Sequence, residues 1–299
     1  MAKHAASADI QETARILARL GDVVVVPIYI DPSRALFREH RKSHIEALKL
    51  FLWAYAFERA GAPQSYRTSA IRALEKCADF WSDKDIPNKI WIDFSRRLGP
   101  TKANPARNPL YPKNSSGSIN YNAVDFCKNR LQSDGQNLYL FSFRNISADK
   151  VRAAHDGLRR IRGIGPKIAS LFLRDIALEN RISDRRLRDR HLLQPIDVWL
   201  RRAAETLTGS DLRDEQASRE LVDIADTADC CAMCLNAGSW YFGSQVVRSE
   251  KPFRESLRNP QALLCNLERH RRDLIERGEW LLEEAKRLSA LSGDGRQSG

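Results

Sequence analysis

Apolar residues recur every three or four positions along most of this chain, and this spacing restricts the fold more than any other feature. A helix with about 3.6 residues per turn gathers such residues on one face, which a neighbouring helix must then cover. Residues 23–30 are β-branched and also fit a short strand. We nevertheless expect an all-α fold, with helices over residues 10–20, 43–60, 66–81, 88–98, 119–131, 147–161, 166–179, 195–207, 219–244, 260–277 and 278–291.

The composition is typical of a globular protein that does not enter a membrane. Apolar residues make up 42% of the 299 residues and charged residues 29%, which is enough to bury a core. The longest apolar run, residues 23–30, contains Pro27 and is far shorter than the ~20 residues of a membrane-spanning helix. The first residues lack the apolar core of a secretory signal. We therefore expect a cytoplasmic protein with no membrane association.

The net charge is strongly positive and favours a polyanionic partner. The formal charge is +11 at pH 7, and basic residues are densest at 159–167 and 181–202. Each Lys or Arg that replaces a condensed cation on DNA releases that cation to solution, so such clusters favour nucleic-acid binding. Residues 183–193 are almost all charged. They form either a DNA contact or a solvated loop whose Asp184 and Asp189 partly cancel its arginines.

The six cysteines do not predict a disulfide scaffold or a metal centre. Without a secretory signal, structural disulfides are not expected. Only Cys231 and Cys234 have C-x-x-C spacing, and no second pair follows to complete a zinc or iron–sulfur ligand set. We interpret them as cysteines buried in helices and expect no metal site.

Residues 158–175, LRRIRGIGPKIASLFLRD, predict two helices joined by a tight hairpin. Ser147 can cap the first helix, which ends near Gly163. Pro166 suits the first position of the second helix. Gly163 and Gly165 permit positive φ and a close approach of the backbone to another surface. The amide groups at the start of the second helix then form a natural phosphate site.

This segment resembles the helix-hairpin-helix motif, whose main-chain amides grip a DNA phosphate. Ile161 and Ile164 beside the glycines, followed by Lys167, match the motif more specifically than the glycines alone. Downstream, the run Pro195-Ile196-Asp197 resembles the segment that opens the next helix in DNA glycosylases of the endonuclease III and 8-oxoguanine DNA glycosylase superfamily. The alternatives are an ordinary helical hairpin with a surface lysine and a carboxylate that merely caps a helix.

The resemblance implies a catalytic pair. Lys167 matches the lysine nucleophile of the bifunctional members, which act as both glycosylase and lyase at abasic sites, and Asp197 matches their essential aspartate. Three features depart from the common pattern. The thirty-residue separation of the pair resembles that of the archaeal 8-oxoguanine glycosylases, Trp199 replaces a histidine near the DNA backbone, and the four-cysteine iron–sulfur loop of endonuclease III is missing.

The resemblance also implies a two-lobed all-helical fold with the active site between the lobes, acting as a monomer on double-stranded DNA. No cofactor or iron–sulfur cluster is required, although the family's hairpin often coordinates a monovalent cation through its carbonyls. The residues expected to contact DNA are Arg162, Gly163, Ile164, Gly165, Trp199 and Arg201. The expected boundaries are one lobe over residues 1–64 and 208–291, a second over 65–207 with the hairpin at 147–180 and the aspartate segment at 194–202, and a disordered tail at 292–299.

The sequence does not identify the base that is removed. An oxidised guanine is the nearest reading from the family, and a hypermodified pyrimidine of viral DNA is an alternative that would imply a role in defence. Several aromatic residues could stack on a base, but a place in the core is expected for each: Trp53, Tyr55, Phe80, Trp81, Trp91, Trp240 and Tyr241. Two other classes compete with an enzyme. One is a DNA-binding module that uses the hairpin only as a phosphate clamp, and the other is an RNA-binding protein with an incidental lysine.

Overall fold

The computed structural model describes residues 7–57, 64–76, 85–99, 107–112, 121–131 and 134–293, with side chains up to residue 282. Over these residues every element is helical, and pairing of the β type is limited to one bridge between Tyr121 and Ile161. The all-α prediction is therefore confirmed. None of the helices in this part of the chain is both long and apolar enough to cross a membrane.

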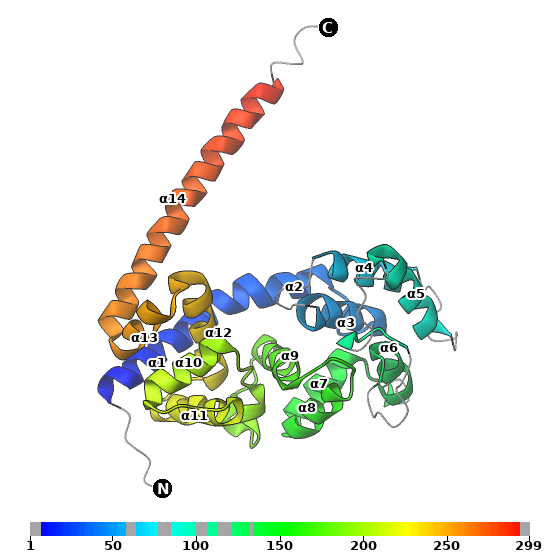
Figure 1. The fold of residues 1–299 in the computed structure, drawn as a ribbon, viewed down its shortest axis with the longest axis horizontal. Helices are drawn as coiled ribbons and strands as arrows, with labels where there is room; N and C mark the ends of the chain where they lie inside the picture. The colour runs from blue at the N-terminus through cyan, green and yellow to red at the C-terminus, as the bar shows by residue number, and fades with distance from the viewer. Residues whose placement is uncertain are drawn as a thin grey trace.

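Most of the described helices follow one another closely along the chain, whereas α5 and α6 are separated by residues 99–122 (Figure 1). In chain order they are α1 Ala8–Leu20, η1 Gly21–Ile30, α2 Asp31–Leu36, α3 His44–Phe51, η2 Leu52–Ala56, α4 Gln64–Glu75, α5 Ile86–Leu98, α6 Ala123–Phe126, η4 Cys127–Leu131, α7 Leu138–Ser147, α8 Val151–Arg159, α9 Pro166–Glu179, η6 Asp184–Arg186, η7 Arg190–Leu193, α10 Val198–Thr208, α11 Asp214–Thr227, α12 Ala232–Tyr241, η8 Phe242–Val247, α13 Glu250–Arg258 and α14 Pro260–Gly293.

Short polar side chains fix where several of these helices begin. The first backbone amides of a helix have no partner within it, and a Ser, Asn or Asp side chain at the N-cap accepts from them. Ser43 accepts from the third residue of α3 at 3.2 Å, and Asn137 does the same for α7 at 2.8 Å. These caps define helix starts that the apolar spacing alone leaves uncertain by a few residues.

The β-branched run at residues 23–30 is helical, so the strand alternative is wrong. This run lies in η1, which continues α1 directly into α2. The amide of Asp31 donates to the carbonyl of Val26, five residues back, which gives the wider turns of a π-helix. Pro27 lies inside η1 and has no amide hydrogen to give to the usual partner four residues back.

The buried side chains form two main clusters, and the buried face of α9 belongs to the first of them. The first cluster takes its residues from 37–193, together with Met233. The second combines residues 14–18 of α1 with residues 196–263. This division differs from the predicted boundaries: Phe51 packs in the first cluster, and Leu200 packs in the second. Apolar spacing identifies the buried face of a helix but not the helix that covers it. The sequence therefore could not show which cluster Phe51 and Leu200 join.

Two glycines let α1 and α12 cross with their backbones in contact. A Cβ atom added at Gly238 would lie 1.8 Å from the carbonyl oxygen of Leu17. A Cβ atom added at Gly21 would lie 2.0 Å from the carbonyl oxygen of Cys234. No larger residue fits at either position without moving a helix. The N-terminal helix is thereby held directly against α12 in the second cluster.

The last helix, α14, extends away from the rest of the molecule (Figure 1). Leu263 is fully buried near its start, whereas Trp280, Leu281 and Leu282 are each about 60% exposed. The two helical segments predicted at 260–277 and 278–291 form this single helix, which Gly278 does not interrupt. Residues 292 and 293 belong to it, and the rest of the predicted disordered tail lies outside the described residues.

Candidate functional site

The predicted hairpin is formed by α8 and α9. Gly163 has φ of +73°, the left-handed conformation that favours glycine. The strand-like segment at Tyr121 holds the first half of the hairpin, because its amide donates to the Arg160 carbonyl at 2.7 Å and its carbonyl accepts from the Arg162 amide at 2.8 Å. The turn of the hairpin is thus pinned from the side by a segment some forty residues earlier in the chain.

The first helix of the hairpin begins later than predicted. Ser147 is the last residue of α7 and does not cap α8, which starts at Val151. Asp149 lies between them with φ of +56°, and this left-handed residue breaks the helical path. The amide of Lys150 donates back to the Asn145 carbonyl at 2.8 Å and closes the turn. The predicted single helix over 147–161 was therefore wrong at its start.

The start of α9 is open. Gly165 is its N-cap and Pro166 its first residue, as the sequence predicts, and no side chain caps it. Gly165 has φ of −88° and ψ of 178°, so the positive φ expected there is found only at Gly163. Nothing lies within 4 Å of a Cβ atom added at Gly165. Within this protein, therefore, neither the backbone conformation nor a neighbouring atom accounts for a glycine at position 165.

Two predicted DNA contacts on the hairpin, Ile164 and Arg162, are engaged within the protein. Ile164 is 5% exposed, packs in the first cluster, and donates its amide to the Ile161 carbonyl. The Arg162 side chain is also buried, and its guanidinium lies 5.3 Å from the centre of the Tyr111 ring. These side chains support the hairpin from inside. Any contact that they make with a ligand requires the backbone or a rearranged side chain.

Lys167 and Asp197, thirty positions apart, meet in space. The lysine Nζ lies 3.9 Å from the aspartate Oδ2, with the lysine side chain 56% exposed and the aspartate 15% exposed. Asp197 is the N-cap of α10, and its Oδ1 accepts from the amides of Trp199 at 2.9 Å and Leu200 at 3.0 Å. One carboxylate oxygen is therefore fixed by the helix, and the other faces the lysine.

A buried polar bridge, which the sequence did not predict, links the lysine helix to the aspartate segment. Arg174 of α9 donates to the side-chain oxygen of Asn236 at 2.9 Å. The Asn236 amide nitrogen in turn lies 3.5 Å from the carbonyl oxygen of Pro195, two residues before Asp197. Both side chains are almost fully buried. Two polar residues within apolar helical faces were the only signal of this bridge.

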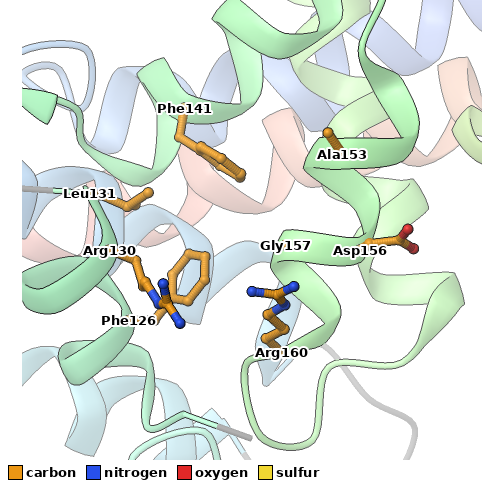
Figure 2. Close-up of a pocket in the computed structure, with 8 residues that line it drawn as sticks. All are labelled: Phe126, Arg130, Leu131, Phe141, Ala153, Asp156, Gly157 and Arg160. Atoms are coloured by element: carbon orange, nitrogen blue, oxygen red, sulfur yellow. The ribbon is translucent and has the colours of Figure 1, made fainter. Parts of the chain in front are cut away.

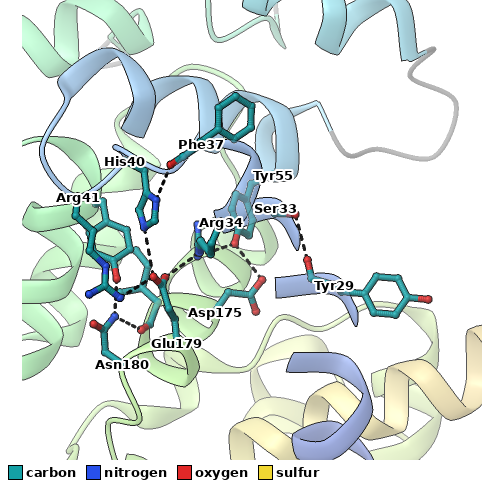
Figure 3. A network of polar contacts seen from close by, with 12 residues as sticks. Tyr29, Ser33, Arg34, Phe37, His40, Arg41, Tyr55, Asp175, Glu179 and Asn180 are labelled. Carbon is teal, nitrogen blue, oxygen red and sulfur yellow. Dashed lines mark hydrogen bonds and ion pairs between the residues drawn. The ribbon is translucent and has the colours of Figure 1, made fainter. Parts of the chain in front are cut away.

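The C-terminal half of α9 is held by a buried network of charges, shown in Figure 3. Arg34 of α2 lies 2.8 Å from Glu179 and donates to the Tyr55 hydroxyl at 3.0 Å. That hydroxyl donates to Asp175 at 3.1 Å. Burial raises the pKa of Glu179, but a hydrogen bond from His40 and the charge of Arg34 outweigh burial and bring the pKa to about 2. The network ties residues 34–55 to the lysine helix.

The other two predicted DNA contacts, Trp199 and Arg201, lie on α10. The Trp199 ring packs against Phe253 with centroids 5.1 Å apart, and a Cβ atom added at Gly243 would lie 2.6 Å from this ring. Trp199 therefore helps to pack the second cluster. Arg201 is half exposed and pairs with Asp214 at 2.6 Å.

The charged segment at 183–193 is a compact connector between α9 and the aspartate segment. Its buried Asp184 accepts from the amide of Ala232 at 3.0 Å. Its arginines pair with carboxylates on other elements: Arg185 with Asp229 at 2.6 Å, Arg188 with Asp149 at 2.6 Å, and Arg190 with Asp226. Carboxylates of other elements, and not only Asp184 and Asp189, therefore offset these arginines. The pairing engages these arginines without deciding whether they also meet DNA.

A cavity of about 400 Å³ lies between η4, α7 and α8 (Figure 2). Phe126 and Phe141 form apolar walls, and Arg130 and Arg160 stand at its edge. Neither Lys167 nor Asp197 is among its lining residues, so it is not a pocket beside that pair. Among the aromatic residues considered for stacking, Trp53, Trp91 and Trp240 pack against other rings, while Phe80 and Trp81 lie outside the described residues.

Comparison of this chain with protein-family models, with curated proteins and with solved structures returned no match. The approach of Lys167 to Asp197 and the motif resemblance are therefore the observations that bear on function.

Proposed function

We propose that this protein is a two-lobed DNA glycosylase of the helix-hairpin-helix kind that also cleaves the strand at the abasic site it creates. The proposal is carried by the 3.9 Å approach of Lys167 Nζ to Asp197 Oδ2. This chemistry needs an amine nucleophile and a nearby carboxylate that accepts its proton. The Asp197 carboxylate is held in place by two helix amides, so its free oxygen has a fixed direction.

The open start of α9 supports DNA binding by the hairpin. A helix N-terminus without a side-chain cap offers its amides, and the positive end of its dipole, to a phosphate. The missing Cβ at Gly165 leaves room for that phosphate to approach the backbone. Lys167 lies two residues beyond Gly165, so a strand held there brings its sugars close to the amine. The base must then be turned out of the duplex, at a cost of a few kcal/mol.

The reaction proceeds through a covalent bond between lysine and sugar. The neutral Lys167 amine attacks C1′ of the deoxyribose, and the bond from C1′ to the base breaks, its electron pair leaving with the base. The sugar ring opens to a Schiff base between C1′ and the lysine. Loss of a proton from C2′ then expels the 3′ phosphate and cuts the strand, and hydrolysis of the Schiff base frees the enzyme.

Asp197 serves two purposes in this scheme. Its Oδ2 accepts the proton that Lys167 must lose, and its negative charge stabilises the positive charge that develops on the sugar. Lys167 is 56% exposed without DNA, so the exclusion of water that strengthens these interactions must come from the bound duplex. The chemistry uses no metal or organic cofactor.

The substrate class follows from the resemblance alone. We propose an oxidised guanine in double-stranded DNA as the first substrate to test, with a hypermodified viral pyrimidine as the second. Such an enzyme would act as a monomer in the cytoplasm, associated with the nucleoid when bound to DNA. A base-release screen over duplexes that each carry one lesion or modification distinguishes these substrates.

The direct test of the mechanism is reduction of the Schiff base with borohydride on an abasic duplex. The wild-type protein should become covalently attached to the DNA, and Lys167→Ala should not, while duplex affinity stays within a few-fold because the hairpin amides remain. Lys150→Ala is a matched control, since this exposed lysine begins the other helix of the hairpin. Equal trapping by Lys167→Ala would assign another nucleophile. Duplex binding by the wild type with no trapping and no base release would favour a DNA-binding module.

A further inference from the structure

The C-x-x-C pair has a geometry that its sequence spacing did not establish. Cys231 is the N-cap of α12, with extended backbone angles of φ −76° and ψ 121°. Its sulfur accepts the amide hydrogen of Cys234 at 3.3 Å, the position that a serine oxygen takes in an ordinary cap. Cys231 is half-buried, and Cys234, in the first turn of the helix, is buried. The prediction of two cysteines buried within a helix therefore applies to Cys234 alone.

The surroundings make the two thiols unequal. A hydrogen bond from the Cys234 thiol, aided by backbone amides of the first turn, lowers the pKa of Cys231 although burial opposes this. The same hydrogen bond, followed by burial, raises the pKa of Cys234. Negative charge on sulfur is therefore favoured at the more accessible cysteine. The Cys234 thiol lies beside the Cys231 sulfur and donates a hydrogen bond to it.

The neighbouring cysteine is not a competing partner. Cys230 directs its thiol to the Ala14 carbonyl at 3.9 Å, on α1, and burial raises its pKa to about 12. Cys265 is exposed and lies on α14. Within the described residues no cluster of three or more metal-binding side chains is found, which leaves the pair without a metal-site geometry.

We propose that Cys231 and Cys234 form a redox-active dithiol, with Cys231 as the attacking sulfur and Cys234 as the resolving one, that exchanges with low-molecular-weight disulfides. This inference does not depend on the proposed DNA chemistry.

The exchange takes place in two balanced steps. The Cys231 thiolate attacks one sulfur of a small disulfide such as oxidised glutathione, forming a mixed disulfide and releasing one thiolate. Cys234 then loses its proton and attacks the Cys231 sulfur, forming the intramolecular disulfide and releasing the second thiolate. Two protein thiols are oxidised, and one small disulfide is reduced to two thiols. An excess of reduced glutathione reverses both steps.

The test uses the full-length protein in mixtures of reduced and oxidised glutathione, quenched with acid, alkylated and mapped by mass spectrometry. The wild type should form a reversible disulfide between residues 231 and 234. Cys234→Ser should stop at a mixed disulfide of Cys231 with glutathione, and Cys231→Ser should form neither product. Serine is a good N-cap, so Cys231→Ser should keep the fold, which circular dichroism verifies.

Cys265→Ser is the control and should behave as the wild type does. The proposal predicts that Cys231 is alkylated by iodoacetamide at pH 7 at least several-fold faster than Cys265. Equal alkylation rates, oxidation that joins Cys230 instead, or no internal disulfide at any glutathione ratio would each overturn it. Stoichiometric zinc on the purified protein that blocks alkylation of the pair would also overturn it.

Discussion

The two ends of α9 are built in opposite ways. At its start, Gly165 and Pro166 leave the helix without a side-chain cap, and Lys167 is half exposed. Toward its end, Asp175 is buried and Glu179 is only 10% exposed, and they pair with residues of η2 and α2. A helix anchored at one end and open at the other holds its first-turn groups in a fixed position while leaving them free to meet a ligand. Substitutions at the open end should therefore change function, and those at the anchored end should change stability.

The largest effect is expected for Asp197→Asn. The Asp197 side chain faces Lys167, at the open start of α9. Asparagine keeps an oxygen that caps α10, so stability should change little, but the charge facing Lys167 is lost. Single-turnover base release should fall by about 10²- to 10⁴-fold, the range for loss of a general acid–base group. Asp197→Ala serves as the comparison, because it should also lose about 1 kcal/mol of cap stability. Base release at the wild-type rate in Asp197→Asn would leave Asp197 as a structural cap only.

The anchored end should respond in stability to substitution of Glu179. Glu179→Gln removes a charge that buried Arg34 depends on, which costs about 3 kcal/mol. Chemical denaturation measures this loss, and trapping of an abasic duplex should be unchanged under conditions where the variant is folded. A fully stable variant with impaired trapping would reverse the assignment of the two ends of α9.

Acid should weaken the same anchor. Glu179 has a pKa near 2 in the folded protein, below its ordinary value, so its contribution is complete above about pH 4.5 and is lost as the pH falls toward 2. The melting temperature of the wild type should therefore fall more steeply between pH 5 and pH 2 than that of Glu179→Gln. Parallel curves for the two proteins would show that Glu179 does not carry this dependence.

Smaller effects are expected for alanine substitutions of the two hairpin glycines, one of which should change stability and the other DNA affinity. Gly163→Ala should destabilise the protein by about 1 kcal/mol, because alanine is strained at positive φ. Gly165→Ala should leave stability nearly unchanged, since its backbone is extended and the space is empty. Its duplex affinity should nevertheless fall by several-fold if a phosphate approaches there. Unchanged duplex affinity in Gly165→Ala, measured by fluorescence anisotropy, would show that no DNA phosphate contacts the backbone at this position.

The smallest effect is expected in the connector. Neutralising Arg185, Arg186, Arg188 and Arg190 together should cost little stability, because solvent screens the exposed pairs that are lost. Because three of these arginines are already paired within the protein, the slope of log affinity against log salt should stay close to that of the wild type. A decrease approaching 0.9 per arginine would instead show that the connector lies on DNA.

Local signals in the sequence predicted the parts of this structure that depend on local chemistry. Pro166 at the start of α9 and Gly163 at positive φ each follow from the preference of one residue for one backbone geometry. The helix expected from residue 195 begins at Val198 instead, with Asp197 as its N-cap. The error in the predicted start of α8 also has a local cause, but the sequence signal for it is weak. Asp149 adopts a left-handed conformation that aspartate tolerates without requiring it.

Contacts between residues far apart in the chain could not be predicted from the sequence. The approach of Lys167 to Asp197 was expected only through the motif resemblance, because thirty residues of spacing do not define a distance. The bridge from Arg174 through Asn236 to Pro195 joins three separate elements, and nothing in the local sequence of any one of them indicates the other two. Likewise, a lone C-x-x-C does not show that Cys231 caps a helix.

The projecting α14 has a consequence for measurements in solution. Its 34 residues extend over about 51 Å at 1.5 Å per residue, whereas a compact domain of this chain length has a radius of gyration of about 19 Å. A rod attached to a compact body increases hydrodynamic drag far more than it increases mass. One chain should therefore elute from a gel-filtration column earlier than a sphere of 34.1 kDa and be mistaken for a dimer. Mass from light scattering, not elution volume, is the quantity that reports how many chains are present.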